Sequence, residues 1–159
     1  MKNRSTMNEQ EMKDFSIKLM REANVTCFTT VDVTGYPHTR AIFNLRNIKQ
    51  FPTLAKIFEN QKEDLLIYIS TNTSSTKVKH IRTNTAVSLC FTDPEDFRGL
   101  TLGGDIEIVT DETIKKELWL DWWDKYYPKG IEDEDYTILM LQPKTVEVWY
   151  KGKFKFQFT

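Results

Sequence analysis

Cysteine is scarce in this sequence, and long apolar runs are missing. Cys27 and Cys90 are the only cysteines among the 159 residues, and both lie in apolar, strand-like runs. Two isolated cysteines are too few for a disulfide framework, so we interpret them as buried thiols in a reducing compartment. No apolar run approaches the roughly 20 residues of a membrane span, and the N-terminal MKNRSTMNEQEMKDF lacks the apolar core of a signal peptide. We therefore expect a cytoplasmic protein with no membrane partner.

The motifs of several common enzyme classes are also absent. There is no G-x-S-x-G elbow, and only His38 and His80 could act as histidine bases, which argues against a serine hydrolase. The two histidines and two distant cysteines do not have the spacing of zinc ligands. The acidic runs at 93–96 and 132–135 lack the alternation and the glycine of an EF-hand, so we interpret them as solvated loops. Without a G-x-G-x-x-G or Walker loop, a nucleotide would have to be held in another way.

Neither sign of charge dominates the composition. Lys and Arg together number 22, Asp and Glu number 23, and the formal net charge is −1. This balance argues against a broad surface for nucleic acid or for anionic lipid, so we expect no nucleic-acid partner. The apolar and charged fractions, 40% and 28%, are those of an ordinary globular protein. Together with the length they predict a single domain over 1–159.

Hydrophobic periodicity predicts the secondary structure. Apolar residues three and four apart indicate an N-terminal helix at about 8–23. A short helix begins at Pro52, and a longer one is capped by Asp111 and carries an apolar stripe. The stripe consists of Ile114, Leu118, Trp119, Trp122 and Trp123. Strands are expected at 25–31, 36–48, 65–69, 86–92, 97–110, 136–141 and 146–150, and the Phe-rich tail at 151–159 supplies one more edge strand.

The connections between these strands predict the fold class. Most strands are joined by turns too short for a helical crossover, so the sheet should be largely antiparallel. Gly103-Gly104 interrupts a long strand, which indicates a bulge or a sharp bend. Strands of this length with a bend favour a small barrel over a flat sheet. We predict a mainly β protein with flanking helices (α+β), built on an antiparallel barrel.

The most informative stretch is LLIYISTNTSSTKVKHIRTN at 65–84. An apolar strand runs through a hydroxyl-rich turn into a short helix, whose first backbone N–H groups are unpaired and carry partial positive charge. Ser75 and Thr76 add hydroxyl donors, and Lys77 adds a full charge in a first turn, where the helix dipole disfavours it. A bound phosphate would explain this lysine. The alternative is a Ser N-cap followed by a solvated lysine.

Arg40 is the second notable residue, because it lies in mid-strand between apolar neighbours. It is either paired with an acidic residue, exposed on an edge, or joined with Lys77 and the hydroxyls of Ser75 and Thr76 around one phosphate. The third feature is an aromatic set in the second half of the chain, for which burial in the core or in a dimer interface is the simpler interpretation. One or two of these rings could instead cover a planar cofactor. The set comprises Trp119, Trp122, Trp123, Tyr126, Tyr127 and Trp149.

Four segments in order resemble the pyridoxamine 5'-phosphate oxidase-like superfamily, and most closely its general stress protein branch. They are TTVDVTGYPHTR at 29–40, STNTSSTKVKHIRTNTAVSL at 70–89, GDIEIVTDETIKKELW at 104–119, and YYPKGIEDEDYTILMLQPKTVEVWY at 126–150. The resemblance covers about residues 20–150. It implies an FMN-binding split β-barrel that forms a homodimer with the cofactor at the interface.

The resemblance also implies a set of FMN-binding residues. By the family pattern, Arg40 binds the FMN phosphate together with Ser75, Thr76 and Lys77. The flavin lies along Thr39, Ala41 and Ile42 of one strand and Ser70 and Thr71 of another, and Trp149 approaches it from the partner subunit. No catalytic residue is implied.

One departure from the family pattern limits the implied activity. True pyridoxamine-phosphate oxidases place a lysine for the substrate phosphate five residues after the strand arginine, and this position is Leu45 here. The C-terminal substrate motif of the oxidases also has no clear counterpart. We therefore expect an FMN-dependent oxidoreductase with a different substrate. The alternatives are a non-catalytic module that binds flavin or haem, and a structural dimer with an empty site.

Overall fold

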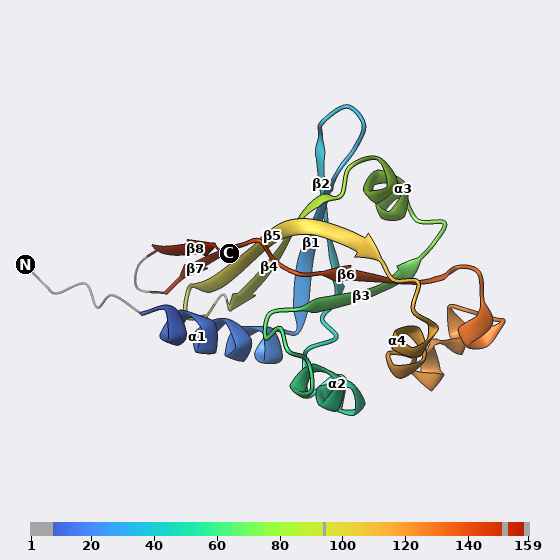
Figure 1. Cartoon of the computed structure of the whole chain (residues 1–159), viewed down its shortest axis with the longest axis horizontal. Helices are drawn as coiled ribbons and strands as arrows, with labels where there is room; N and C mark the ends of the chain where they lie inside the picture. The colour runs from blue at the N-terminus through green and yellow to red at the C-terminus, as the bar shows by residue number, and fades with distance from the viewer. Residues whose placement is uncertain (1–7, 94, 151–152, 158–159) are drawn as a thin grey trace, which may run out of the picture.

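The computed structural model describes residues 8–93, 95–150 and 153–157. Within them, eight antiparallel strands curl into a half-barrel with helices around it (Figure 1). The main strand order is β2-β1-β4-β5-β6-β3, and β7 pairs with β5 and β8. The strands are β1 (Val25–Val31), β2 (Pro37–Phe43), β3 (Ile67–Asn72), β4 (Ala86–Asp93), β5 (Arg98–Ile108), β6 (Tyr136–Leu141), β7 (Thr145–Trp149) and β8 (Lys153–Gln157).

Strand β5 holds the sheet together because it changes partners along its length. Its first part pairs with β7 as far as Gly103, and its last part pairs with β6 from Ile106 onward. The register with β4 passes through both glycines without an extra residue, so no bulge forms there. Gly104 is needed for close approach, since a Cβ at this position would lie 3.0 Å from Leu141 Cδ1 and 3.2 Å from the carbonyl oxygen of Gln142. The double glycine therefore marks the exchange of partners.

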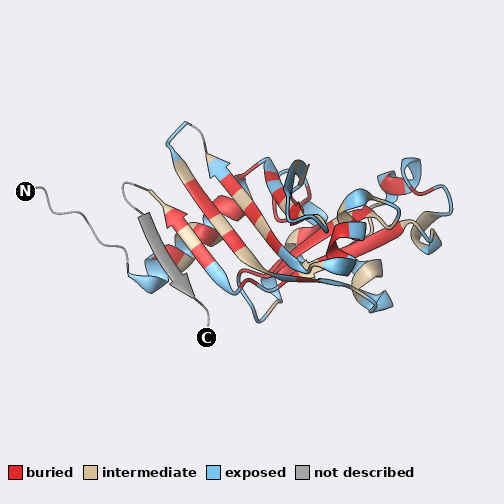
Figure 2. Ribbon diagram, turned by 90° about the horizontal axis from the view of Figure 1, so that it is seen from above, coloured by how far each residue is buried: buried red, intermediate tan, exposed pale blue. Residues whose placement is uncertain are grey.

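The main core lies between the concave side of the sheet and α1 (Glu9–Glu22). Asn8 caps the N-terminus of this helix with a capping box. Its side chain accepts a hydrogen bond from the Glu11 N–H, and the Glu11 carboxylate accepts one from the Asn8 N–H. Leu19 and Met20 of α1 are buried against the strands. Buried and exposed residues alternate along the strands in Figure 2, as expected for a sheet covered on one side. The expected helix at about 8–23 is confirmed.

The returning strand is shorter than the sequence suggests. β2 ends at Phe43, and the expected extension to residue 48 is wrong. The Asn44 side chain is buried, and its amide donates to the carbonyls of Met20 and Ala23, both at 2.7 Å. These bonds serve carbonyl groups at the end of α1 that no helical N–H can reach. The chain turns here because Asn44 connects it to α1.

The helix expected after Asp111 is also shorter. Asp111 caps α4 (Glu112–Glu117) as predicted, but the chain then leaves the helix and continues in the 3₁₀ turns η2 (Asp121–Lys125) and η3 (Gly130–Glu132). The aromatic stripe is thus spread over two elements. Trp123 and Tyr127 are buried in a second core cluster, whereas Trp122 and Tyr126 are 43% and 48% exposed. The burial expected for most of the aromatic set holds for only part of it.

The remaining short elements contribute to both core clusters. The turn η1 (Pro52–Leu54) and α2 (Ala55–Glu59) together form the helix expected at 52–58. α3 (Thr76–Thr83) follows β3 directly. In the tail, β8 pairs with β7 and confirms the expected edge strand, and residues 151, 152, 158 and 159 lie outside the described part. No helix among the described residues is long and apolar enough to cross a membrane.

Candidate functional site: a cationic cavity beside the edge strand

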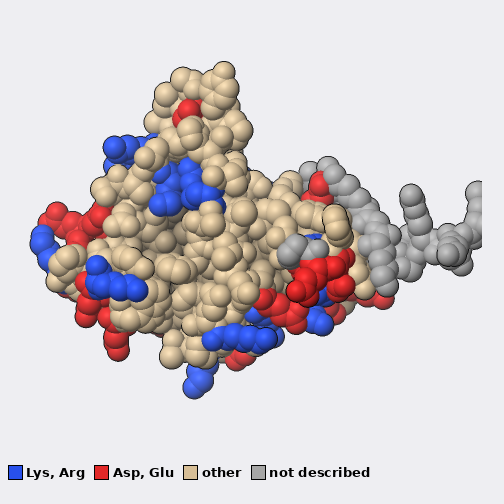
Figure 3. All heavy atoms as spheres, turned by 180° about the vertical axis from the view of Figure 1, so that it is seen from behind, with Lys and Arg blue, Asp and Glu red and all other residues tan. Residues whose placement is uncertain are grey.

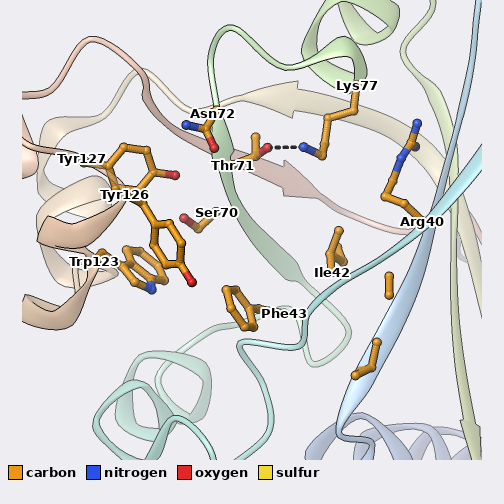
Figure 4. A pocket seen from close by; sticks show the side chains of 12 residues that line it. Arg40, Ile42, Phe43, Ser70, Thr71, Asn72, Lys77, Trp123, Tyr126 and Tyr127 are labelled. Carbon is orange, nitrogen blue, oxygen red and sulfur yellow. Dashed lines mark hydrogen bonds between the residues drawn. The ribbon is translucent and has the colours of Figure 1, made fainter.

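A cavity of about 440 Å³ lies where the edge strand β2, the end of β3, the start of α3 and the η2 segment come together. Two cations from β2 and α3 lie on one side of it, and aromatic rings from η2 and the residues after it lie on the other (Figure 4). It is lined by Val25, Arg40, Ala41, Ile42, Phe43, Ser70, Thr71, Asn72, Lys77, Trp123, Tyr126 and Tyr127. Its size and mixed lining are those of a small-molecule site.

Arg40 is held against the sheet by one of its terminal nitrogens. Nη1 donates to the carbonyl of Phe28 at 3.1 Å and to Thr30 Oγ1 at 2.9 Å. A guanidinium has five N–H donors, so the three at Nε and Nη2 have no hydrogen bond to a described residue. No described carboxylate forms an ion pair with Arg40, so among the described residues the structure does not support the first of the three alternatives, an acidic partner. Burial alone lowers the pKa of Arg40.

Lys77 approaches the same place from the first turn of α3. Its Nζ donates to Thr71 Oγ1 at 2.7 Å, across the turn that joins β3 to α3. Burial, and secondarily the charge of Arg40, lowers the pKa of Lys77. The lysine is half-buried, so it is only partly solvated. Two cations that repel each other thus share one cavity without an acidic partner among the described residues.

The start of α3 adds uncommitted donors. Ser75 occupies the N-cap position, but its side chain makes no capping bond and instead lies 3.5 Å from Thr71 Oγ1. The N–H groups of Val78 and Lys79 both point to the Ser75 carbonyl, at 3.1 and 3.2 Å. The N–H groups of Thr76 and Lys77 precede these bonds and have no partner within the helix. This is the donor arrangement that anions use at helix N-termini.

The opposite wall of the cavity is aromatic. The Tyr127 hydroxyl points toward Ser70 (Figure 4), and burial raises the pKa of this phenol although the hydrogen bond with Ser70 opposes the shift. Tyr126 and Phe43 are half-exposed at the rim. On the face shown in Figure 3, Lys and Arg atoms gather below the projecting tip of the β1–β2 hairpin, from which Arg40 comes. The cavity is therefore electropositive at one end and apolar and planar at the other.

The structure brings six of the ten predicted residues together: Arg40, Ala41, Ile42, Ser70, Thr71 and Lys77 all line the cavity. Ser75 lies next to these residues, because its Oγ is 3.5 Å from Thr71 Oγ1. Thr39 and Thr76 are exposed outside the lining, and the Thr39 hydroxyl bonds to that of Thr29 at 2.8 Å. Trp149 is further away, on β7, where its indole covers Gly99. Its approach to a flavin from the partner subunit stays a prediction.

Sequence reasoning missed several lining residues. Val25 and Phe43 face each other on β1 and β2, one register step from Ile42. Asn72 is the last residue of β3 and lies within the hydroxyl-rich run. Phe43 follows Arg40 on the same strand, which was an available signal. The sequence favours packing for Trp123, Tyr126 and Tyr127, because nothing in it shows where η2 lies.

The segment after β2 places no further charge in the cavity. Leu45 is 2% exposed in the second core cluster. The next residue, Arg46, is also buried and donates from Nε to the Leu66 carbonyl at 2.9 Å, and its guanidinium lies 4.7 Å from the Phe58 ring centroid. Burial, reinforced by the charge of Arg21, lowers the pKa of Arg46 to about 10. The charge that an oxidase supplies from this segment is therefore absent from the cavity.

Fold and cavity together define a class of protein, the antiparallel split barrel with an electropositive cavity at its sheet edge. The chain belongs to the family described as "Pyridoxamine 5'-phosphate oxidase like", whose model matches residues 54–159. No protein with a curated description matches it. Its fold class and its resemblance to the general stress proteins are thereby confirmed, as the solved structures show.

Three solved structures illustrate the likeness. A Clostridium acetobutylicum protein related to general stress protein 26 is 27% identical, with a TM-score of 0.73 over 94% of this chain and 96% of its own. General stress protein 26 of Bacillus anthracis is 18% identical, with a TM-score of 0.69 over 92% and 98%. A heme binding protein of Mycobacterium smegmatis is 14% identical, with a TM-score of 0.66 over 92% and 57%. The two more distant likenesses concern the fold alone.

Proposed function

We propose that the protein binds FMN in this cavity and acts as a flavin-dependent oxidoreductase whose substrate is not pyridoxamine phosphate. The observation that carries the proposal is the pair Arg40 and Lys77, two half-buried cations that form no ion pair with any described carboxylate. Holding like charges together costs free energy in the free protein. A phosphate dianion would remove that cost and would accept from the donors of both residues.

The donors suit a terminal phosphate. Arg40 offers three unused N–H groups, the helix start offers the N–H groups of Thr76 and Lys77, and the Ser75 hydroxyl is not used for capping. A tetrahedral phosphate can accept from several directions at once, unlike a planar carboxylate. These donors would hold the phosphate, and the β3–α3 turn would fix its distance from β2.

The rest of the cavity suits a flat ring system. Ala41 is small and Ile42 is apolar, which would let a ring lie along β2, and Ser70 and Thr71 present hydroxyls at the edge of the cavity. The aromatic wall limits access of water on the opposite side. When bound, FMN supplies hydride or single-electron transfer. The chain's own residues would bind it, orient it and tune it, and we assign no catalytic acid or base.

A second copy of the chain would complete the site. The outer face of the sheet beside the cavity is exposed and carries small side chains at Cys27 and Ala41, which are register partners, next to the exposed Val25 and Phe43. A flat, uncharged sheet face of this kind suits a homodimer interface. Cys27→Asp would place a charge at its centre, so we expect this variant to sediment as a monomer where the wild type is a dimer. Asn60→Asp, at an exposed site after α2, should stay dimeric.

The direct test is titration with FMN, followed by absorbance and by thermal shift. We expect a bound flavin spectrum and a higher Tm with FMN, and anaerobic reduction of the bound flavin by NADH or NADPH. No shift and no flavin band would refute FMN binding. Bound FMN that neither nicotinamide reduces, over a range of pH, would favour a non-catalytic binding module instead.

Haem is the second candidate ligand, because a structural neighbour is described as a heme binding protein. Propionates could pair with Arg40 and Lys77, but haem iron needs an axial ligand, and no histidine or cysteine lines the cavity. The Tyr126 and Tyr127 phenols are the lining groups able to serve. A Soret band on haem addition that is lost in Tyr126→Phe or Tyr127→Phe would support haem over FMN.

A further inference from the structure

Behind Arg40, on the side away from the cavity, lies a buried pair that no part of the proposed site accounts for. Thr30 on β1 is fully buried, and His80 on α3 is 8% exposed. Thr30 Oγ1 lies 2.9 Å from Arg40 Nη1 and 2.9 Å from His80 Nδ1. The hydroxyl thus connects the cation of the cavity to an imidazole in the protein interior.

The donors and acceptors in this chain can be worked out. The arginine can only donate, so Thr30 Oγ1 accepts from it. Thr30 has one proton, and the His80 nitrogen is the only other described atom with which the hydroxyl forms a hydrogen bond. If His80 Nδ1 were protonated, the Thr30 proton would be buried without an acceptor, which costs free energy. Thr30 therefore donates to an unprotonated Nδ1, and the proton of neutral His80 is on Nε2.

This arrangement limits where the guanidinium can go. Nη1 is held by the Phe28 carbonyl and by Thr30, so Nε and Nη2 remain without a described partner on a residue that lines the cavity. Without these anchors, repulsion from Lys77 would move Arg40 toward solvent, because the side chain is only half-buried. His80 follows Lys77 by three residues on α3, so one helix carries both the second cation and the residue that orients Thr30.

We infer that Thr30 and His80 are positioning residues for phosphate recognition: His80 Nδ1 accepts a hydrogen bond from the Thr30 hydroxyl, and Thr30 in turn accepts one from Arg40 and holds its free donors for the phosphate. The inference rests on the proposed function for the identity of the phosphate. Loss of the hydrogen bond from Arg40 to Thr30 should weaken the binding of a ligand that carries a phosphate. The affinity for the same ligand without its phosphate should stay unchanged.

Titration of Thr30→Val with FMN and with riboflavin tests this consequence. Valine keeps the shape and β-branching of threonine but lacks the hydroxyl. We expect FMN to bind on the order of tenfold more weakly, as for loss of a hydrogen bond to a charged group, with riboflavin affinity unchanged. Thr30→Ser restores the hydroxyl and should restore most of the FMN affinity. An equal loss for both ligands, or no rescue by serine, would overturn the positioning role.

Thr26→Val is the matched control. Thr26 is on the same strand and the same buried face, and its hydroxyl donates to the Cys90 carbonyl at 3.0 Å rather than to any site residue. The control should lower stability to a similar extent as Thr30→Val while the ratio of FMN to riboflavin affinity stays that of the wild type. A ratio that falls equally in both variants would assign the effect to general loosening of β1 and refute the inference.

The direction of the hydrogen bond has its own test without any ligand. Nitrogen-15 spectra of the imidazole rings distinguish the two neutral tautomers, and His38→Gln identifies the signals of His80, since the chain has two histidines. We expect an unprotonated Nδ1 in His80, and a protonated Nδ1 would overturn the inference. Wild-type protein that binds FMN no better than riboflavin would refute the proposed function. A wild-type preference for FMN that Thr30→Val leaves intact would refute the positioning role alone.

Discussion

Lys77→Met separates binding from stability more clearly than any other single substitution in the cavity. Methionine keeps the length and apolar stem of the lysine but removes its ammonium group. In the free protein that group is half-buried, is repelled by Arg40 and has one hydrogen bond, to Thr71 at 2.7 Å. The same group would become a direct partner of the phosphate once FMN is bound.

The two effects have different sizes. A hydrogen bond between charged partners contributes about 1.5–3 kcal/mol, which corresponds to roughly ten- to hundredfold in Kd. In the free protein, loss of the Thr71 bond costs about 0.5–1.5 kcal/mol, and relief of the repulsion between half-exposed cations offsets a comparable amount. We therefore expect FMN to bind at least tenfold more weakly, while the free energy of unfolding of the free protein changes by less than about 1 kcal/mol.

Isothermal titration with FMN and urea unfolding of the free protein measure the two quantities. A change in packing cannot explain a selective loss of FMN affinity, because methionine preserves the apolar stem of residue 77. Lys77→Arg keeps the charge and should retain most of the affinity. Wild-type affinity in Lys77→Met would refute the phosphate assignment, and a loss of several kcal/mol in stability would show that the lysine has a structural role.

Three further predictions follow from other parts of the molecule. FMN affinity should fall as the pH rises through the lowered pKa of Lys77, because the free protein then loses the charged ammonium that the phosphate would favour. Lys77→Arg should flatten this profile. Asn44→Ala should lower the free energy of unfolding by about 1–3 kcal/mol, because the Met20 carbonyl loses its bond from the buried amide; exposed Asn60→Ala is the control in urea unfolding, and an equal effect in both would contradict the reasoning. Gly99→Ala should displace the Trp149 indole, since the new Cβ would lie 1.8 Å from Trp149 Cζ2. Tryptophan fluorescence and Tm should both change. Flavin fluorescence should change too if Trp149 contacts the partner's cofactor.

Local patterns were sufficient for the elements whose causes are local. The helix at about 8–23, the cap at Asp111 and the strand–turn–helix at 65–84 depend on residues close to one another in the chain, and the sequence predicts each of them. The same holds for the cations of the cavity. Arg40 in mid-strand and Lys77 in a first turn each conflict with their local surroundings, and such a conflict is visible without coordinates.

Long-range contacts decided the elements that sequence reasoning placed wrongly. β2 ends at Phe43 because Asn44 bonds to carbonyls about twenty residues earlier in the chain, although the strand pattern continues past it. The aromatic helix breaks after Glu117 because Trp123 and Tyr127 pack into a cluster with strands β3 and β6. Hydrophobic periodicity shows which residues are apolar, but it does not show which of several apolar surfaces they pack against.

A strand arginine and a helix lysine, each at a position where an unpaired cation is costly, are visible in the amino-acid sequence. The folded chain adds that the two share one cavity, that no described carboxylate neutralises either, and that Thr30 links Arg40 to His80. An unfavourable position for a charge is a property of one residue and its neighbours in sequence. Bringing the two cations and their partners together requires β1 with Thr30, β2 with Arg40 and α3 with residues 77–80 to meet in space.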